Sequence, residues 1–102
     1  MWMLRTTEEA KQPFLFRITP GNIKTMGRAT RADFVVDAAL VSRLHCRLAA
    51  GAGEIEAVDL ESTNGTYVNG ERVARALLKD GDKLRVGAVE LLVVRTGLAA
   101  ES

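Results

Sequence analysis

Three short segments of the sequence carry more hydrogen-bonding side chains than strands or turns require. They are Met26-Gly27-Arg28, Val41-Ser42-Arg43-Leu44-His45 and Ser62-Thr63-Asn64-Gly65-Thr66. A guanidinium, hydroxyls and an amide can together hold a polar or charged ligand. A serine, a histidine and an acid can instead perform nucleophilic chemistry. Binding and catalysis are therefore the two kinds of function that these residues raise.

Two Asn-Gly pairs lie close together in the sequence, and they differ in their surroundings. Asn69-Gly70 stands between apolar β-forming residues, which predicts a two-residue type I′ hairpin turn. Asn64-Gly65 follows Ser62 and Thr63, whose hydroxyls a plain turn does not need. The first pair is therefore expected to shape a loop that has another task.

The elements that position these segments are predicted to be short strands. Runs rich in β-branched and aromatic residues are interrupted by Gly, Asn and Asp roughly every eight to twelve residues. Alternation predicts that Leu44, Cys46 and Leu48 face a core and that His45 does not. Residues 74–78 favour a strand over a helical turn. The other predicted strands are residues 14–19, 24–28, 34–37, 44–50, 54–60, 66–68, 71–73, 82–86 and 89–94.

So many short strands predict an all-β fold, a sandwich in which two stacked sheets cover each other's apolar faces. We expect one domain at residues 13–96, with flexible tails at residues 1–12 and 97–102. Loops gather at the two ends of a sandwich, so the polar segments can meet at one of them. The initiating Met favours a whole protein or an N-terminal piece, while the oligomeric state is left open.

Composition argues against several classes of function. A net charge of +1 argues against a general nucleic-acid surface. No apolar run approaches the roughly 20 residues of a membrane span, and no signal peptide is evident. Cys46 is the lone cysteine, which fits a cytoplasmic protein and a small core residue. With a single His beside it, no usual zinc site can form, and we expect neither a metal nor a cofactor.

The order of the polar segments resembles the pattern of forkhead-associated (FHA) domains. A single Asn-Gly or Gly-Asp pair is common, but the whole series in this order over residues 14–95 is specific. The matching elements are Gly27-Arg28, Ser42-Arg43-Leu44-His45, Ser62-Thr63-Asn64-Gly65-Thr66, Val68-Asn69-Gly70, Gly81-Asp82-Lys83-Leu84 and Gly87. The resemblance implies a sandwich of about eleven mostly antiparallel strands whose loops at one end bind a phosphothreonine in an extended peptide.

The resemblance also implies a role for each residue. Arg28 and Ser42 would hold the phosphate, with Thr63 as a further donor and Arg43 as a nearby charge. Asn64 would clamp the ligand backbone, because an amide both donates and accepts. Gly27, His45 and Gly65 would be the scaffold of the site. The implied partners are phosphothreonine-containing proteins that are substrates of a Ser/Thr kinase, without catalysis, nucleic acid or membrane insertion.

Three other functions compete with this one. Ser42, His45 and Asp59 could form a hydrolase triad, but no Gly-x-Ser-x-Gly elbow is present. An interaction module of the same fold could bind partners independently of phosphate. Nucleic-acid phosphate could be bound through the arginines, and this would require a steep salt dependence. Those arginines are Arg28, Arg31, Arg43 and Arg47.

Two regulatory details are also expected. Thr6 and Thr7 precede acids in the predicted N-terminal tail and could be phosphorylated and then bound by a neighbouring copy. Residues 37–41 bring no charge next to Ser42, which favours ligands with apolar residues a few positions after the phosphothreonine.

Overall fold

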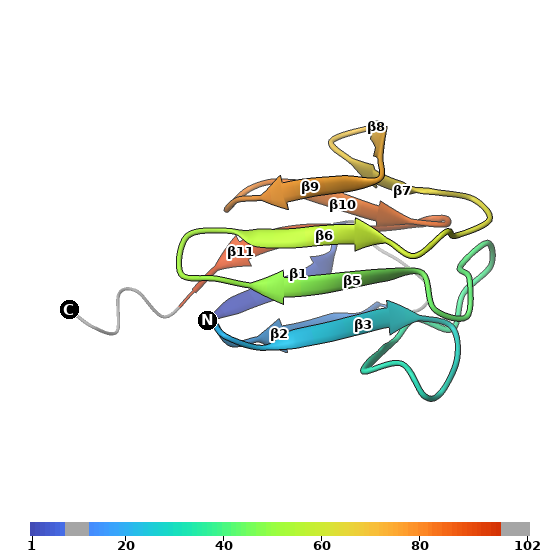
Figure 1. The fold of residues 1–102 in the computed structure, drawn as a ribbon, viewed down its shortest axis with the longest axis horizontal. Helices are drawn as coiled ribbons and strands as arrows, with labels where there is room; N and C mark the ends of the chain where they lie inside the picture. Colours follow the sequence, from blue (N-terminus) through green and yellow to red (C-terminus); the bar gives the residue numbers. More distant parts are fainter. Residues whose placement is uncertain (8–12, 97–102) are drawn as a thin grey trace.

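A computed structural model describes residues 1–7 and 13–96 of the chain, and these residues form eleven strands and no helix (Figure 1). None of them belongs to a helix that could cross a membrane. In chain order the strands are β1 (Trp2–Thr6), β2 (Leu15–Ile18), β3 (Ile23–Gly27), β4 (Phe34–Val35), β5 (Cys46–Ala50), β6 (Ile55–Asp59), β7 (Thr66–Val68), β8 (Glu71–Val73), β9 (Arg75–Leu78), β10 (Lys83–Val86) and β11 (Val89–Arg95).

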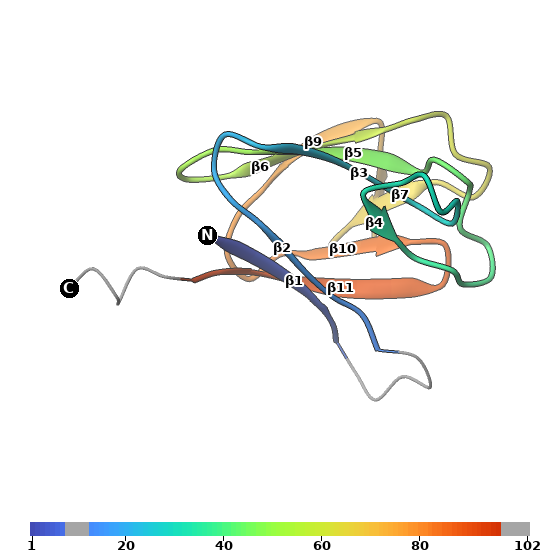
Figure 2. The same ribbon diagram turned by 90° about the horizontal axis from the view of Figure 1, so that it is seen from below.

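The strands make two stacked sheets, so the predicted all-β sandwich is confirmed (Figure 2). The six-stranded sheet has the order β2-β1-β11-β10-β7-β8, and the five-stranded sheet has the order β4-β3-β5-β6-β9. Neighbouring strands are antiparallel except for β3 and β4, which are parallel. Residues 74–78 were expected to be extended, and β9 confirms it.

The N-terminal segment belongs to the sandwich, so the flexible tail predicted for residues 1–12 is wrong for residues 2–6. β1 lies between β2 and β11. Trp2 is fully buried, and its Nε1 donates to the Gly51 carbonyl at 2.9 Å, which ties the two sheets together. The missed signal is the alternation of buried Trp2 and Leu4 with the less buried Met3 and Arg5. The remaining predicted tail residues, 8–12 and 97–102, lie outside the described residues.

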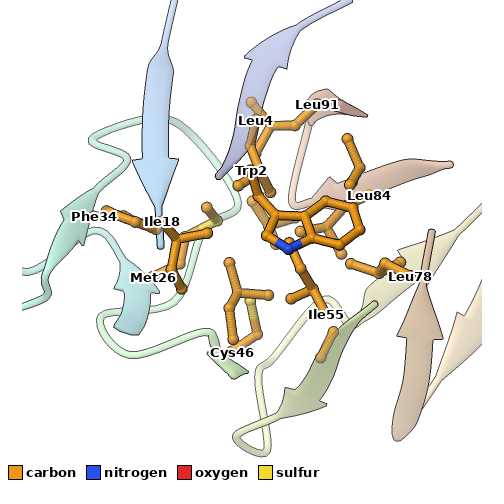
Figure 3. Close-up of a cluster of buried hydrophobic side chains, with 14 of the residues drawn as sticks. Trp2, Leu4, Ile18, Met26, Phe34, Cys46, Ile55, Leu78, Leu84 and Leu91 are labelled. Carbon is orange, nitrogen blue, oxygen red and sulfur yellow. The ribbon is translucent and has the colours of Figure 1, made fainter. Parts of the chain in front are cut away.

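The core lies between the sheets and is built by alternate residues of each strand. Trp2 is its largest side chain and packs with apolar side chains from both sheets (Figure 3). Cys46 and Leu48 point into it, as their parity predicted, and Cys46 is a free thiol. Burial raises the pKa of Cys46 to about 12, with a smaller contribution from the charge of Asp59, so the thiol stays neutral and acts as a small apolar residue.

The second Asn-Gly pair forms the predicted hairpin between β7 and β8. Asn69 and Gly70 have φ angles of 51° and 87°, the left-handed pair that a type I′ turn requires. The Asn69 amide is also bonded on both sides. Its Oδ1 accepts from the Lys83 amide at 2.9 Å, and its Nδ2 donates to Asp82 Oδ1 at 3.2 Å. The turn is therefore fastened to the start of β10.

Candidate functional site

The loops that follow β3, β4 and β6 gather at one end of the sandwich, away from the N-terminus (Figure 1). They enclose a pocket of about 570 Å³. Its lining combines side chains from all three predicted polar segments with the segment that precedes Ser42. The lining residues are Arg28, Asp37, Ala38, Ala39, Leu40, Val41, Ser42, Thr63 and Asn64.

Arg28 is held at the pocket by its own backbone and by one side-chain nitrogen. Its amide donates to the Ser42 carbonyl at 2.9 Å, and its Nε donates to the Val41 carbonyl at 3.0 Å. These bonds fix the direction of an exposed side chain. The two terminal nitrogens of the guanidinium carry no hydrogen bond to the described residues, so they can bind an anion in the pocket.

Ser42 and Asn64 connect the loops on opposite sides of the pocket. The Ser42 hydroxyl oxygen accepts from the Thr63 amide at 3.0 Å, which leaves its own proton to donate. Asn64 Nδ2 donates to the Leu40 carbonyl at 3.1 Å. The Asn64 side-chain oxygen has no partner among the described residues, so half of this amide remains available to a ligand.

His45 is a buried residue that holds two of the site loops together. Its Nδ1 accepts from the Ser42 amide at 3.0 Å, so Nε2 carries the proton and donates to the Gly65 carbonyl at 2.8 Å. The alternation correctly places it outside the apolar cluster, yet its exposed fraction is 0% because the site loops close over it. A buried imidazole that bonds two loop backbones has the contacts that a scaffold role requires.

Asp59, at the end of β6, organises the loop that carries Thr63 and Asn64. Its carboxylate accepts from the Ser62 amide at 3.1 Å, from the Ser62 hydroxyl at 2.5 Å and from the Thr66 hydroxyl at 2.7 Å. Partial burial alone would raise the pKa of Asp59, but these hydrogen bonds to the charged form outweigh it and lower the pKa. The Ser62 hydroxyl in turn accepts from the Gly65 amide at 3.0 Å, which closes the turn.

Two glycines are required where backbones approach each other near the site. A Cβ on Gly27 would lie 2.0 Å from the Arg43 carbonyl oxygen, so β3 could not pass beside that loop. A Cβ on Gly87 would lie 2.6 Å from the Leu40 carbonyl, and Gly87 also has a φ of 58°. Gly87 thus lets the turn between β10 and β11 support the pocket wall formed by Leu40.

Backbone strain is concentrated in the same loops. Leu40 has a φ of 70° and Glu61 a φ of 59°, values that side chains other than Asn and Asp rarely adopt. Leu40 is held there by the bond from Asn64 and by Gly87, and its side chain is 58% exposed. An apolar side chain kept in a strained conformation at the mouth of a pocket is suited to contact a ligand.

The structure brings four of the predicted site residues together and leaves one outside. Arg28, Ser42, Thr63 and Asn64 all line the pocket, whereas Arg43 does not. The Arg43 side chain is exposed, while its carbonyl accepts from the Ala29 amide at 3.1 Å. Its predicted contribution of charge to the site therefore stays a prediction.

The sequence analysis considers residues 37–41 for ligand preference and Asp59 for a triad, but it does not name their roles in building the site. Asp37 and Leu40 line the pocket, and Asp59 holds its loop. The spacing of an acid three residues before Ser62 is typical of a side chain that bonds the following turn, and could have indicated Asp59. Leu40 has no local signal, because its position depends on Gly87 and Asn64 from distant parts of the chain.

The alternative hydrolase triad is not assembled. Both ring nitrogens of His45 are bonded to backbone groups, and neither bonds the Ser42 hydroxyl. Asp59 bonds Ser62 and Thr66, and no hydrogen bond joins it to His45 in the described part of the chain. The geometry therefore lacks the base that a nucleophilic serine needs.

The threonines expected in a free tail are instead hydrogen-bonded to the six-stranded sheet. Thr6 is the last residue of β1, and its amide donates to the Phe14 carbonyl at 3.1 Å. The Thr7 hydroxyl donates to Glu90 Oε1 at 3.0 Å. Reaching the pocket of a neighbouring copy would require this strand to detach, because an extended phosphopeptide cannot stay paired in the sheet.

The comparisons with known proteins agree with this geometry. The family model of the FHA domain matches residues 24–87. The chain is 42% identical over 82 residues to an ABC transporter ATP-binding/permease protein of Mycobacterium tuberculosis, which covers 80% of this chain and 9% of that protein. It is 41% identical over 66 residues to the glycogen accumulation regulator GarA of Mycolicibacterium smegmatis, which covers 65% of this chain and 42% of GarA.

The fold matches a solved structure from a study of phosphothreonine-dependent FHA domain interactions. The TM-score is 0.80 at 31% identity, and the match covers 95% of this chain and 98% of that one. By contrast, the chain spans less than half the length of the two curated relatives named above.

Proposed function

The chain belongs to the FHA domain family, and on that basis we propose that it is a phosphothreonine-peptide-binding module that recognises phosphorylated partner proteins. The observation that carries the proposal is the pocket shared by Arg28, Ser42, Thr63 and Asn64. A phosphorylated side chain brings about −1.5 to −2 charges and three acceptor oxygens. The free guanidinium nitrogens and the Ser42 hydroxyl match these acceptors.

Asn64 supplies the other half of recognition. Its side-chain oxygen can accept from a backbone amide of the ligand while Nδ2 stays bonded to Leu40. Because the loops are fixed before binding by Asp59 and His45, little ordering is required when the peptide arrives. The exposed Leu40 supports the expectation of an apolar ligand residue near the phosphothreonine.

The module acts by binding and not by catalysis, which is supported by the bonding of both His45 ring nitrogens to backbone groups instead of to the Ser42 hydroxyl. Its partners are phosphothreonine-containing substrates of a Ser/Thr kinase. A cytoplasmic setting fits the single cysteine, which the fold uses as a buried thiol. Affinity in the micromolar range, about −8 kcal/mol, suits reversible signalling.

The test is a calorimetric titration of a phosphothreonine peptide and its unphosphorylated twin into the wild type and the Arg28→Ala variant. The phosphopeptide should bind the wild type alone, since truncating one partner of a charge-assisted pair costs about 2–5 kcal/mol. Equal affinity for both peptides would favour a phosphate-independent interaction module. Wild-type affinity in Arg28→Ala would overturn the assignment of the site.

A further inference from the structure

The outer face of the six-stranded sheet collects positive charge. Alternate residues of each strand, such as Trp2 and Leu4 on β1 and Leu84 on β10, point into the core. The neighbouring residues along each strand therefore point away from it. The cross-strand registers then place one set of cations on the same outer face. These cations are Arg5, Arg17, Arg72, Lys83 and Arg85.

Little negative charge balances this face in the part of the chain that the structure describes. Glu90 is the one acid on its strands that points outward, and it lies opposite Arg85 and already accepts from the Thr7 hydroxyl. No salt bridge among the described residues involves the cations of this face. Apolar side chains such as Leu92 and Val94 lie between them, opposite Arg5 and Met3 in register.

The outer face of the other sheet is different. There Arg75 Nε is paired with Glu56 at 3.1 Å, on neighbouring strands β9 and β6. Among strands β3, β5, β6 and β9 of this sheet, Arg47 is the other cation that points outward, and Ile23 and Leu77 are exposed apolar residues. The excess of positive charge is thus a property of one face and not of the whole molecule, whose formal net charge is only +1.

The basic face reaches the loop that carries Thr63 and Asn64. The Arg72 guanidinium lies against Gly65, where an added Cβ would be 2.6 Å from its Nε. Tyr67 is opposite both Arg72 and Arg85, and the Arg85 guanidinium lies 3.9 Å from the centre of the Tyr67 ring. A row of two arginines and an aromatic ring therefore begins directly beside the loop that carries Asn64.

We propose that this face is a second contact surface, which binds an acidic segment of the same phosphorylated protein whose phosphothreonine occupies the pocket. The inference rests on the proposed function and adds a charge requirement to it. Clustered cations without salt-bridge partners attract an anionic segment and speed its encounter. Arg85 also donates to the Gly87 carbonyl at 3.1 Å, which holds its guanidinium in place on this face. Arg72 and Arg85 are two strand spacings apart, about 10 Å, which an extended peptide covers in about three residues. Two acidic residues about three positions apart would therefore reach both arginines.

The experiment compares phosphothreonine peptides that share a core and differ in their extensions. One has neutral Gly and Ser extensions, one has four acidic residues on the N-terminal side, and one has them on the C-terminal side. We expect one acidic peptide to bind the wild type about tenfold more tightly than the neutral one at low salt, as several exposed ion pairs would give. Raising the salt should remove most of that gain.

Matched variants show whether the basic face causes the tenfold gain in affinity. Arg72→Gln combined with Lys83→Gln should abolish the tenfold gain while leaving the neutral phosphopeptide bound as in the wild type. Arg47→Gln, an exposed arginine on the opposite sheet, should keep the gain. Thermal unfolding of each variant shows whether it is folded, and Lys83→Gln alone provides a milder change if the double variant is not.

The outcomes separate this inference from the proposed function. Equal binding of the acidic and neutral phosphopeptides, or a gain that survives in the double variant, would overturn the inference and leave phosphothreonine binding intact. If neither phosphopeptide binds, the proposed function itself fails. Binding of duplex DNA or anionic vesicles through Arg72 and Lys83, with no preference for the acidic phosphopeptides, would assign the face to another class of partner and would also overturn the inference.

Discussion

The two Asn-Gly turns of this protein are five residues apart and have opposite uses. Asn69 uses both the oxygen and the nitrogen of its side-chain amide to bond Lys83 and Asp82 at the start of β10, so its turn has a structural role. Asn64 uses one donor to hold Leu40 and keeps its oxygen free at a pocket. The Asn-Gly dipeptide thus determines the turn, whereas the contacts of the Asn side chain determine whether that turn can also bind a ligand.

The largest expected difference is between Asn64→Ala and Asn69→Ala in ligand binding. Asn64→Ala should weaken binding of a phosphothreonine peptide by about 2 kcal/mol, because it leaves polar groups of the ligand and Leu40 without partners. Isothermal titration calorimetry measures this loss. Asn69→Ala should bind like the wild type.

The matched stability measurement should show the reverse order. Asn69→Ala removes two hydrogen bonds that hold β10, and should lower the free energy of unfolding by about 1–2 kcal/mol. Urea denaturation followed by Trp2 fluorescence would detect it. If Asn69→Ala impairs binding as much as Asn64→Ala does, the division of labour between the turns is wrong.

The next effect concerns Asp59, which organises only the first turn. Asp59→Asn should lower the free energy of unfolding by about 2 kcal/mol, since it weakens the charge-assisted bonds from Ser62 and Thr66. Because the folded pKa of Asp59 lies below its ordinary 3.8, its contribution is present above that pH and is lost as the pH falls through the lowered pKa.

Denaturation curves measured from pH 6 to pH 2 test this assignment. The wild type should lose stability in acid more steeply than Asp59→Asn, and the difference between the two proteins should shrink as the pH falls. A difference that is constant over this range would show that the carboxylate charge of Asp59 contributes nothing to the loop.

Replacing the glycines of the two turns should have a smaller effect on ligand binding than replacing Asn64. Gly65 and Gly70 have φ angles of 92° and 87°, so alanine at either position should cost about 1–2 kcal/mol of stability through backbone strain. Only Gly65→Ala also displaces the Arg72 guanidinium, because nothing lies within 4 Å of a Cβ at Gly70.

Because the Gly65 amide donates to the Ser62 hydroxyl and its carbonyl accepts from His45, strain at Gly65 disturbs the loop that carries Asn64. Gly65→Ala should weaken phosphopeptide binding for this reason, whereas Gly70→Ala should leave it unchanged. Parallel titration and denaturation of the two variants check both halves of the statement. Equal losses of affinity would mean that strain in the hairpin reaches the pocket, against the separation of roles inferred from the contacts.

The smallest expected effect is on the reactivity of Cys46, which follows His45 and is paired with Asp59 in the sheet. Its buried thiol, with a pKa of about 12, should be alkylated only after local opening. Asn64→Ala and Gly65→Ala should raise the alkylation rate a few-fold more than the variants at positions 69 and 70 do. Mass spectrometry after timed exposure to iodoacetamide measures the rates.

Much of the fold could be predicted because its signals are local. Alternation at Cys46 and Leu48 and the turn residues Asn69 and Gly70 each predict structure within a few positions, and the structure confirms them. The same alternation is wrong for Leu44, which lies before the start of β5 and outside the buried core cluster. The N-terminal strand was missed because its five residues are few and are followed by acids. Its alternation is a weak local signal, and the pairing of Trp2 with Ile18 and Arg95, which are distant in sequence, shows that it is part of the sandwich.

Some features of the candidate site could likewise be predicted from local sequence, and others could not. Four site residues could be predicted from the sequence, because strands and turns do not need their polar side chains and because they match the family pattern. They are Arg28, Ser42, Thr63 and Asn64. The burial of His45, the strained Leu40 and the guanidinium of Arg72 beside Gly65 depend on loops that close over one another. No local pattern encodes such contacts, because the partners are distant along the chain.

The most direct test of the pocket is a titration of ¹⁵N-labelled protein with a phosphothreonine peptide, followed by NMR at each backbone amide. The amides of Arg28, Ser42, Thr63 and Asn64 should shift together and saturate at one ligand concentration, while those of Asn69 and Gly70 stay in place. Shifts confined to another surface, or the same shifts with the unphosphorylated peptide, would contradict the account.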